Sequence, residues 1–498
     1  MTSKPDSGRY LRSRWPFVRA NRKGELEIDG IEAEKIASKF GTPVYVLVER
    51  EIRNRLNRMW NSFSYPKLRL QYAGKCNSNL EILRVCREEG YELDASSVGE
   101  IILALLADFT PEQITFTNLY KSDNDIAFAA QLGVFAITAD SFEELERMNT
   151  IGERIGIKMK IFLRINPEIE IGTYSTKHHN YGIPLKQAKK SIDFAIKAKY
   201  LDPIGLHFHG SYAETSKSYF LAAEKLLKLS QYAMQNGKII KNIDLGGGFP
   251  IAISDNVVFE PEDFGEEFSV FFERTCRKLG LPLPTLIFEP GKFIVGNAGI
   301  GLFKIISQKT LSGTELLISD ASTYAFLPDV LIYKETYDFL PATKMNKPRI
   351  KKYTLAGSTC DCIDIMAKQL SFPKIETGDL IAVMDCGAYS QVLSTNFNTL
   401  KKAPVVMLQE NQNLKLIRRR DRYSEMFAPE LDVLKVADPA ELMRYYNMHR
   451  VNIDRIWRGS KNQNGKNGNG HANFKLSKAK KSGAKTKRAK KAFKKKSK

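Results

Sequence analysis

The chain has 498 residues and a formal net charge of +20 at pH 7, and 43% of its residues are hydrophobic. This length exceeds one ordinary hydrophobic core and favours two domains with a tail. No apolar run approaches the roughly 20 residues of a membrane span, and residues 1–10 lack the apolar segment of a secretory signal. The six cysteines are scattered along the chain, as free thiols in a reducing compartment usually are. Together, these features predict a soluble cytoplasmic protein.

Short apolar runs alternate with helical stretches between residues 44 and 295. Eight βα repeats of this size favour an α/β fold, a (β/α)8 barrel, over an open doubly wound sheet, although spacing alone does not distinguish the two. In such a barrel the chemistry lies where the strands end at the carboxyl face. The eight expected strands are 68–73, 91–95, 114–117, 134–138, 159–165, 204–209, 240–245 and 285–288.

The first of these strands is followed by Lys75, in the segment Tyr-Ala-Gly-Lys-Cys-Asn that ends at Asn77. Asn77 is expected to cap a helix that begins near Leu80. A lysine after a buried strand can be desolvated enough to lose its proton near neutral pH, which Schiff-base chemistry with a carbonyl cofactor requires. The alternative is a strand-end lysine that reaches into water.

Two further strands end in side chains that suit a cofactor site. The second strand ends at Asp94, which either places a carboxylate at the site mouth or merely caps a turn. The sixth ends in His207-Phe-His209, whose two imidazoles face the same side by alternation. A flat imidazole there could stack on an aromatic cofactor or could be a core histidine.

The last two strands end in a glycine triplet and an acid. Gly246, Gly247 and Gly248 follow the seventh strand, where this fold usually binds phosphate, although a plain flexible turn is the alternative. Glu289 follows the eighth strand, in the segment Glu-Pro-Gly. Its carboxylate could keep a pyridinium nitrogen protonated, or it could be an ordinary turn acid.

After residue 295 the pattern changes to short β-like runs separated by polar turns, which predicts a mostly β domain at 296–425. A helical segment is expected at 426–460. Residues 461–498 contain fourteen lysines, one arginine and no acid, so they carry +15 and are expected to form a disordered basic tail. The tail could bind nucleic acid or another polyanion, or it could be a solvated appendage, because no base-reading motif accompanies it.

These motifs, in this order, resemble pyridoxal-phosphate-dependent decarboxylases of the alanine-racemase-type fold, the group that contains diaminopimelate and ornithine decarboxylases. The resemblance covers roughly residues 25–425 and implies that residues 1–43 join the β domain. It also implies pyridoxal 5'-phosphate as the cofactor, bound covalently by Lys75. The other cofactor-binding residues that it implies are Asp94, His209, Gly246, Gly247, Gly248, Glu289, Gly291 and Tyr389.

Two segments of the expected β domain extend the resemblance. The segment with Cys360 and Asp361 resembles one that reaches into the partner subunit's site, and the segment with Tyr389 resembles one that contacts cofactor phosphate. The resemblance therefore implies a homodimer with shared sites, in which Cys360 returns a proton to Cα. Its implied substrate-binding residues are Lys292, Tyr333, Asp361 and Tyr389. A metal site at Cys-Asp-Cys is not expected, because no second cysteine pair at zinc spacing exists.

The motif layout favours a diaminopimelate decarboxylase, which converts meso-diaminopimelate into lysine and CO2. The arginines that hold the distal carboxylate in that group are replaced here by Lys292 and Leu327. The pattern Cys-Asp-x-x-Asp from Cys360 to Asp364 matches ornithine decarboxylases better. Ornithine, lysine, arginine or a modified amino acid therefore remain open as substrates. An amino-acid racemase, and a non-catalytic regulator or nucleic-acid adaptor, are the alternatives from other classes.

Overall fold

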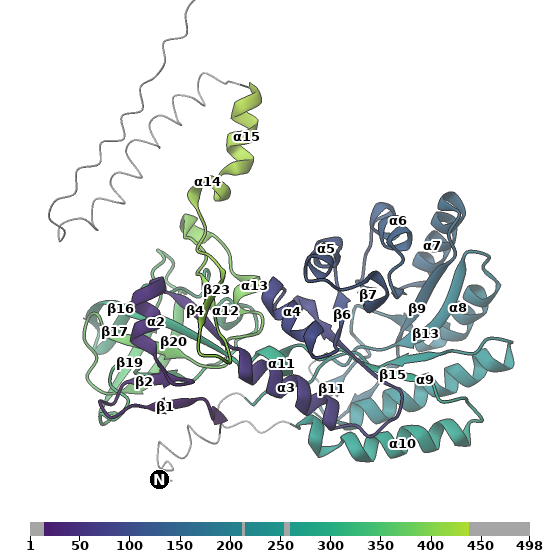
Figure 1. Cartoon of the computed structure of the whole chain (residues 1–498), viewed down its shortest axis with the longest axis horizontal. Coiled ribbons are helices and arrows are strands. Elements are labelled where there is room, and N and C mark those ends of the chain that lie inside the picture. Colours follow the sequence, from purple (N-terminus) through teal and green to yellow (C-terminus); the bar gives the residue numbers. More distant parts are fainter. Residues whose placement is uncertain (1–13, 212–214, 253–258, 438–498) are drawn as a thin grey trace, which may run out of the picture. The chain divides into compact units, whose positions relative to one another are not determined.

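The structure is a computed structural model that describes residues 14–211, 215–252 and 259–437 (Figure 1). The chain divides into two compact units, Met1–Tyr423 and Ser424–Lys498. In the second unit the description includes helix α15, Ala428–Ala437. The rest of the helical segment expected up to residue 460 and the basic tail at 461–498 lie outside the described residues.

Eight parallel strands form a closed barrel in the first unit (Figure 1). The barrel closes because β15 pairs with β5 and β8 pairs with β9. The expected eight-stranded barrel is therefore confirmed. In chain order the strands are β5 Leu68–Ala73, β6 Glu92–Ala95, β7 Ile114–Thr117, β8 Ala136–Ala139, β9 Met159–Asn166, β13 Leu201–His207, β14 Asn242–Asp244 and β15 Thr285–Phe288.

Helices alternate with the barrel strands, and several begin at side-chain caps. Ser97, Ser122 and Ser141 each accept a hydrogen bond from a backbone N–H of the first turn. The cap expected at Asn77 is wrong, because Asn79 caps α4. The helices of this part are α3 Glu49–Asn61, α4 Leu80–Glu88, α5 Val98–Leu106, α6 Asp123–Leu132, α7 Phe142–Ile155, α8 Leu185–Lys197, α9 Lys217–Gln235, α10 Gly265–Lys278 and α11 Lys292–Val295.

The second domain is mostly β, as expected, and its main sheet includes a strand that precedes the barrel in sequence. That strand, β4 Val44–Val48, pairs antiparallel with β16 and parallel with β22. We therefore propose that the barrel domain starts after Val48 rather than at residue 44. The other strands are β16 Gly299–Leu311, β17 Thr314–Ser319, β18 Phe339–Leu340, β19 Lys351–Ala356, β20 Ile365–Phe372, β21 Leu380–Val383, β22 Val405–Leu408 and β23 Leu414–Arg418.

The amino-terminal segment packs on this β domain. Strands β1 Val18–Ala20, β2 Leu26–Ile28 and β3 Ile31–Glu32 form a small sheet of their own, followed by α2 Ala33–Phe40. Side chains of the segment share one buried apolar cluster with β4, β16 and β22. Burial of this shared apolar surface holds the segment on the β domain.

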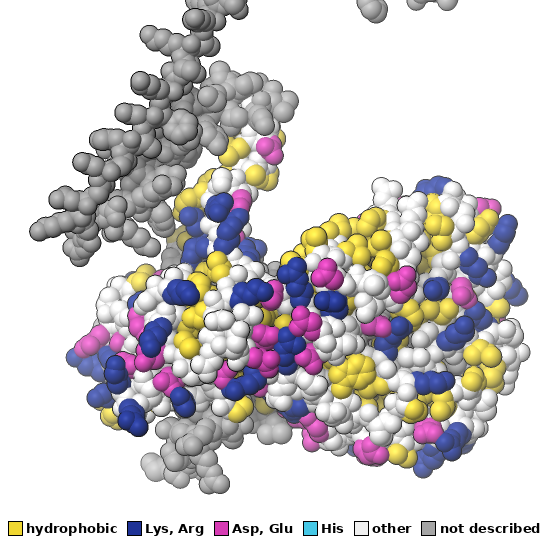
Figure 2. Space-filling model, viewed as in Figure 1, with side chains coloured by type: hydrophobic (Ala, Val, Ile, Leu, Met, Phe, Trp, Pro, Cys, Tyr) yellow, Lys and Arg dark blue, Asp and Glu magenta, His cyan; other side chains and the backbone are white. Residues whose placement is uncertain are grey.

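The surface of the first unit mixes charges of both signs. On the face in Figure 2, basic and acidic side chains are interspersed, and hydrophobic side chains gather over α5. Ile101 and Ala104 of α5 are buried, while Ile102 and Leu106 are about half exposed. Among the described residues, no helix is both long and apolar enough to cross a membrane.

Candidate active site

A cavity of about 640 Å³ lies at the carboxyl ends of the barrel strands. Its wall combines residues that follow β5, β13, β14 and β15 with residues of the β domain, so it stands where the chemistry of this fold is expected. The expected site residues that line it are Lys75, His209, Gly247, Gly248, Glu289, Gly291, Lys292, Tyr333 and Tyr389.

Lys75 lies in the short 3-10 turn Gly74–Cys76, directly after β5. Its Nζ atom is 3.1 Å from Oδ2 of Asp94, a buried carboxylate at the end of β6. Burial disfavours the ammonium, but the negative charges of Asp94 and Glu289 outweigh that effect and raise the pKa of Lys75 above its ordinary value. The expectation that desolvation makes Lys75 neutral is therefore wrong for this protein without cofactor.

Glu289 is a buried carboxylate at the floor of the cavity. Its Oε1 atom is 3.1 Å from Nε2 of His207, and its Oε2 atom lies 3.5 Å from Nδ1 of His209. Burial alone would raise its pKa, but the imidazole of His207 and the ammonium of Lys75 hold the pKa of Glu289 well below its ordinary value. Its Oε2 atom has no hydrogen-bond partner among the described residues. An ionised carboxylate with a free oxygen fits a protonated pyridine nitrogen of the expected cofactor.

His209 presents a neutral imidazole to the cavity. Its Nδ1 atom accepts a hydrogen bond from the backbone N–H of Gly247 at 3.3 Å, which requires an unprotonated nitrogen. Burial lowers the pKa of His209 to about 3. The ring is therefore uncharged at neutral pH, as a flat partner for an aromatic cofactor should be.

The turn after β14 has room only for glycine. The backbone at Gly246 and Gly248 has φ values of +65° and +101°, which side chains rarely adopt. A Cβ atom at Gly248 would overlap with the carbonyl oxygen of Gly210, and one at Gly247 would overlap with that of Glu289. This packing keeps the backbone of the turn open to the cavity, which suits a bound phosphate.

The loop that carries Tyr389 joins the β domain to this site. The backbone N–H of Tyr389 donates to the carbonyl oxygen of Cys76 at 2.8 Å, and the Cys76 thiol donates to the Tyr389 hydroxyl at 3.1 Å. Asn77, instead of capping a helix, donates through Nδ2 to the carbonyl oxygen of Gly387 at 2.9 Å. The aromatic ring of Tyr333 lies 6.1 Å from that of Tyr389. Both domains of one chain therefore form the cavity wall.

Comparisons with known proteins agree with this geometry. The family model described as "Pyridoxal-dependent decarboxylase, pyridoxal binding domain" matches residues 49–296. The diaminopimelate decarboxylase of Pseudomonas aeruginosa is 31% identical over 415 residues, which cover 82% of this chain and 97% of that protein. The chain belongs to the pyridoxal-dependent decarboxylase family.

Other relatives of this decarboxylase support the same family. The diaminopimelate decarboxylase of Bacillus subtilis is 28% identical over 425 residues, which cover 83% of this chain and 97% of that protein. The crystal structure of diaminopimelate decarboxylase from M. jannaschii with L-lysine has a TM-score of 0.76 at 27% identity, and the match covers 83% of this chain and 97% of that one. The protein is a pyridoxal-phosphate-dependent carboxy-lyase.

Cys360 and Asp361 are not among the residues that line the decarboxylase's cavity. Cys360 is exposed, and its Sγ atom accepts a hydrogen bond from Nδ2 of Asn398 at 3.4 Å. The carboxylate of Asp361 accepts a hydrogen bond from the hydroxyl of Tyr324. In a single chain the structure therefore does not bring these two residues to Lys75.

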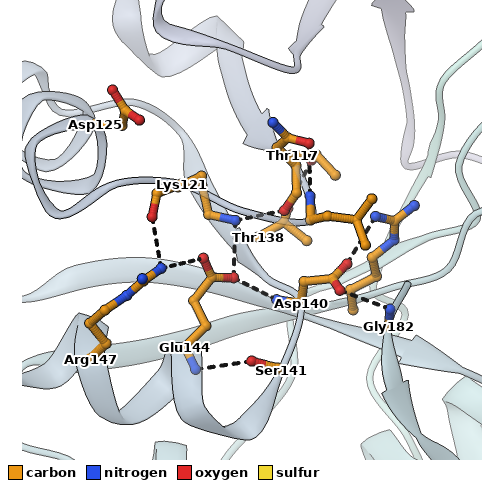
Figure 3. Close-up of polar contacts among 12 residues, drawn as sticks. Thr117, Lys121, Asp125, Thr138, Asp140, Ser141, Glu144, Arg147 and Gly182 are labelled. Atoms are coloured by element: carbon orange, nitrogen blue, oxygen red, sulfur yellow. Dashed lines mark hydrogen bonds and ion pairs between the residues drawn. The ribbon is translucent and has the colours of Figure 1, made fainter. Parts of the chain in front are cut away.

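A layer of buried ion pairs supports the rim of the barrel beside the site (Figure 3). Lys121 is fully buried, donates to the carbonyl oxygen of Asn118, and lies 3.0 Å from Oε2 of Glu144. Asp140 pairs with Arg164 at 3.0 Å and accepts a hydrogen bond from the backbone N–H of Gly182. Sequence reasoning missed this layer, because its members come from separate loops and form no local motif.

Two further residues of the site were also missed. Glu335 lines the cavity from the β domain, and Asp244 is fully buried at the end of β14. Burial and the nearby charge of Glu289 raise the pKa of Asp244. Its position at a strand end, before the glycine triplet, was the signal that could have identified it.

The ligand atoms of His207, His209 and Glu289 lie within 4.8 Å of one another and could also hold a metal ion.

Replacing Gly248 by alanine is expected to lower the free energy of unfolding by about 2 kcal/mol more than replacing Gly237. Both glycines have positive φ, but no described atom lies within 4 Å of a Cβ atom at Gly237, whereas one at Gly248 meets the backbone of Gly210. Urea unfolding of the two variants measures the difference. Equal losses would contradict the steric argument, and cofactor titration should show weaker binding only in Gly248→Ala.

His209 should make the free energy of unfolding of the cofactor-free protein depend on pH. Its folded pKa is about 3, below the ordinary histidine value of about 6.5, so the unfolded chain binds more protons between these values. The free energy of unfolding should therefore fall as pH drops from about 6.5 towards 3. Urea unfolding between pH 7 and 4 should show a smaller fall in His209→Gln. An imidazolium signal from His209 at pH 5 in NMR spectra of 15N-histidine protein would contradict this.

Proposed function

We propose that this decarboxylase acts on meso-diaminopimelate and releases lysine and CO2. The observation that carries the proposal is one cavity that contains Lys75, Glu289 and the glycine turn, with Lys292 at the same wall. The curated relatives named diaminopimelate decarboxylase support it, because this chain covers 97% of several of them.

In this proposal, Lys75 would hold the cofactor covalently through the aldehyde of the cofactor, at the place where the amino group of the substrate would also bind. Asp94 keeps the amine of Lys75 oriented through their 3.1 Å contact. Glu289 would hold the ring nitrogen, His209 would lie against the ring, and the glycine turn with Tyr389 would hold the phosphate. When bound, pyridoxal phosphate supplies the electron sink for the electron pair that remains after CO2 leaves.

The protonation of Cα is assigned to a second subunit. Cys360 is exposed and is not among the residues that line the cavity of its own chain, so we propose that it acts, together with Asp361, in the site of a partner in a two-fold homodimer. A thiol has a proton to donate, whereas a carboxylate at neutral pH has none. Free thiols also suit a reducing compartment, so a cytoplasmic location is part of the proposal.

The test is CO2 release from meso-diaminopimelate, lysine, ornithine and arginine by purified protein with pyridoxal phosphate added. We expect diaminopimelate to give the highest kcat/KM. A higher value for ornithine, lysine or arginine would replace the proposed substrate. Exchange of the Cα hydrogen for deuterium without CO2 release would instead favour a racemase.

We also propose that residues 461–498 bind a polyanion such as nucleic acid, because they carry +15 with no acidic residue. Binding to a labelled duplex should weaken steeply from 50 to 200 mM salt, because charge neutralisation releases counterions. The matched control is the chain truncated before Lys461, which should not bind. Equal binding by both proteins would exclude the tail as the cause.

A further inference from the structure

The cavity contains an acidic side chain to which no motif of the sequence points. Glu335 comes from the β domain, and its carboxylate forms an ion pair with the ammonium of Lys292, which follows the Glu-Pro-Gly segment of the barrel. The side chain of Glu335 is 24% exposed and that of Lys292 is 33% exposed, so the pair remains open to a ligand in the cavity. One anion and one cation therefore lie side by side, separate from the residues assigned to the cofactor.

Glu335 is fixed in place by the backbone and not only by its charge. The carbonyl oxygen of Asp329 accepts hydrogen bonds from the backbone N–H groups of Tyr333 at 2.9 Å and Glu335 at 3.2 Å. The buried carboxylate of Asp329 accepts a further hydrogen bond from the hydroxyl of Ser390 at 3.2 Å. Because Ser390 follows Tyr389, the turn that carries Glu335 is joined to the loop that reaches the cofactor site.

This pair of charges discriminates among the distal groups that a substrate can carry. A distal carboxylate alone would pair with Lys292 but would face the like charge of Glu335. A distal ammonium alone would pair with Glu335 but would face Lys292. A distal group with both charges satisfies both residues, and unpaired charges penalise the alternatives. Leu327 is fully buried and offers no second cation that would favour a lone carboxylate.

We propose that Glu335 is a specificity-determining residue that binds the distal ammonium of a substrate whose distal end also carries a carboxylate, which Lys292 binds. The proposal rests on the proposed function, because meso-diaminopimelate is such a substrate. It assigns recognition of the distal amino group to a residue of the same chain as Lys75, rather than to Asp361 of a partner.

Three substrates test the proposal, because two of them lack one distal charge each. A reaction that releases L-lysine removes the carboxylate of the D centre of meso-diaminopimelate, so its L centre is the distal one. D-Lysine is then diaminopimelate without the distal carboxylate, and D-2-aminopimelate is diaminopimelate without the distal ammonium. For the wild-type holoenzyme, kcat/KM should be at least about tenfold higher for diaminopimelate than for either analogue, the usual scale for a hydrogen bond to a charged group.

Two single variants should then change the substrate preference in opposite directions. Glu335→Gln should lower kcat/KM for diaminopimelate by about 10- to 100-fold and should raise the relative value for 2-aminopimelate. Lys292→Met should raise the relative value for D-lysine. Asp361→Asn is the matched control for the competing assignment, and it should leave the ratio of diaminopimelate to 2-aminopimelate unchanged. The visible absorption of the bound cofactor reports on the integrity of each variant, and Glu335→Asp should retain the wild-type preference.

A uniform fall for all three substrates in Glu335→Gln would mean a merely structural role and would overturn the proposal. So would loss of the diaminopimelate preference in Asp361→Asn but not in Glu335→Gln. If the wild type prefers diaminopimelate and the ratios in Glu335→Gln are unchanged, this inference fails while the proposed function stands. A wild type that prefers D-lysine or D-2-aminopimelate, or uses none of the three, overturns both.

Discussion

Replacing Lys75 by alanine is expected to lower kcat for decarboxylation by about 10³-fold and to remove the visible absorption of covalently bound cofactor. The amine lies at the cavity wall, directly after β5, and the buried carboxylate of Asp94 fixes its position at 3.1 Å. Without it the cofactor can be held only by noncovalent contacts, and the proton transfers that need an amine at that place stop. Absorption spectra and single-turnover CO2 release measure the two effects separately.

Lys67 gives a matched control for that experiment. It stands at the opposite end of the same strand, is exposed, and donates through Nζ to the carbonyl oxygen of Leu283 at 3.0 Å. Lys67→Ala should retain both the absorption and nearly all of the activity. If Lys75→Ala retained either the absorption or a tenth of the activity, the assignment of the covalent amine would be wrong.

The barrel could be predicted from sequence because its strands are buried on both faces. Such strands give near-continuous apolar runs, and each of the eight runs overlaps an observed strand, although β13 starts three residues before the expected run and ends at His207. The same argument placed Lys75, Asp94, His209 and Glu289 at one end of the barrel, since parallel strands end at a common face. These residues do meet there, since Lys75 lies 3.1 Å from Asp94 and His209 lies 3.5 Å from Glu289.

The ionisation of Lys75 could not be predicted from its own strand. Desolvation alone favours a neutral amine, but the outcome depends on carboxylates that come from β6 and from the segment after β15. The domain to which β4 belongs could not be predicted for a similar reason. The apolar run Val44–Val48 fits either domain, and only its pairing with β16 and β22 decides between them.

Glu335 shows a different limit of sequence reasoning. It follows Lys334, whose φ of 57° belongs to a left-handed turn, and it lies in no strand or helix. Neither periodicity nor a known motif indicates that this turn folds back towards Lys292. The side chain was found only because the structure places its carboxylate beside that ammonium.

Replacing Cys360 by alanine is expected to lower kcat by about 100-fold while leaving the absorption of bound cofactor unchanged. The loop that carries Cys360 is rigid, because the buried carboxylate of Asp364 accepts hydrogen bonds from the backbone N–H and hydroxyl groups of both Thr323 and Thr359. In the proposed homodimer, the exposed thiol would be available to the site of the partner subunit.

Mixed dimers test whether the thiol acts across the interface. Co-expression of Lys75→Ala with Cys360→Ala should restore about a quarter of wild-type activity, because half of the dimers are mixed and each has one site with both native residues. The control pair is Lys75→Ala with Glu289→Gln. Both of those changes lie in the cavity of one barrel, so every site in the mixed dimer keeps a defect and no activity should return. No recovery in the first mixture, although mixed dimers can be isolated, would mean that each chain forms its active site alone.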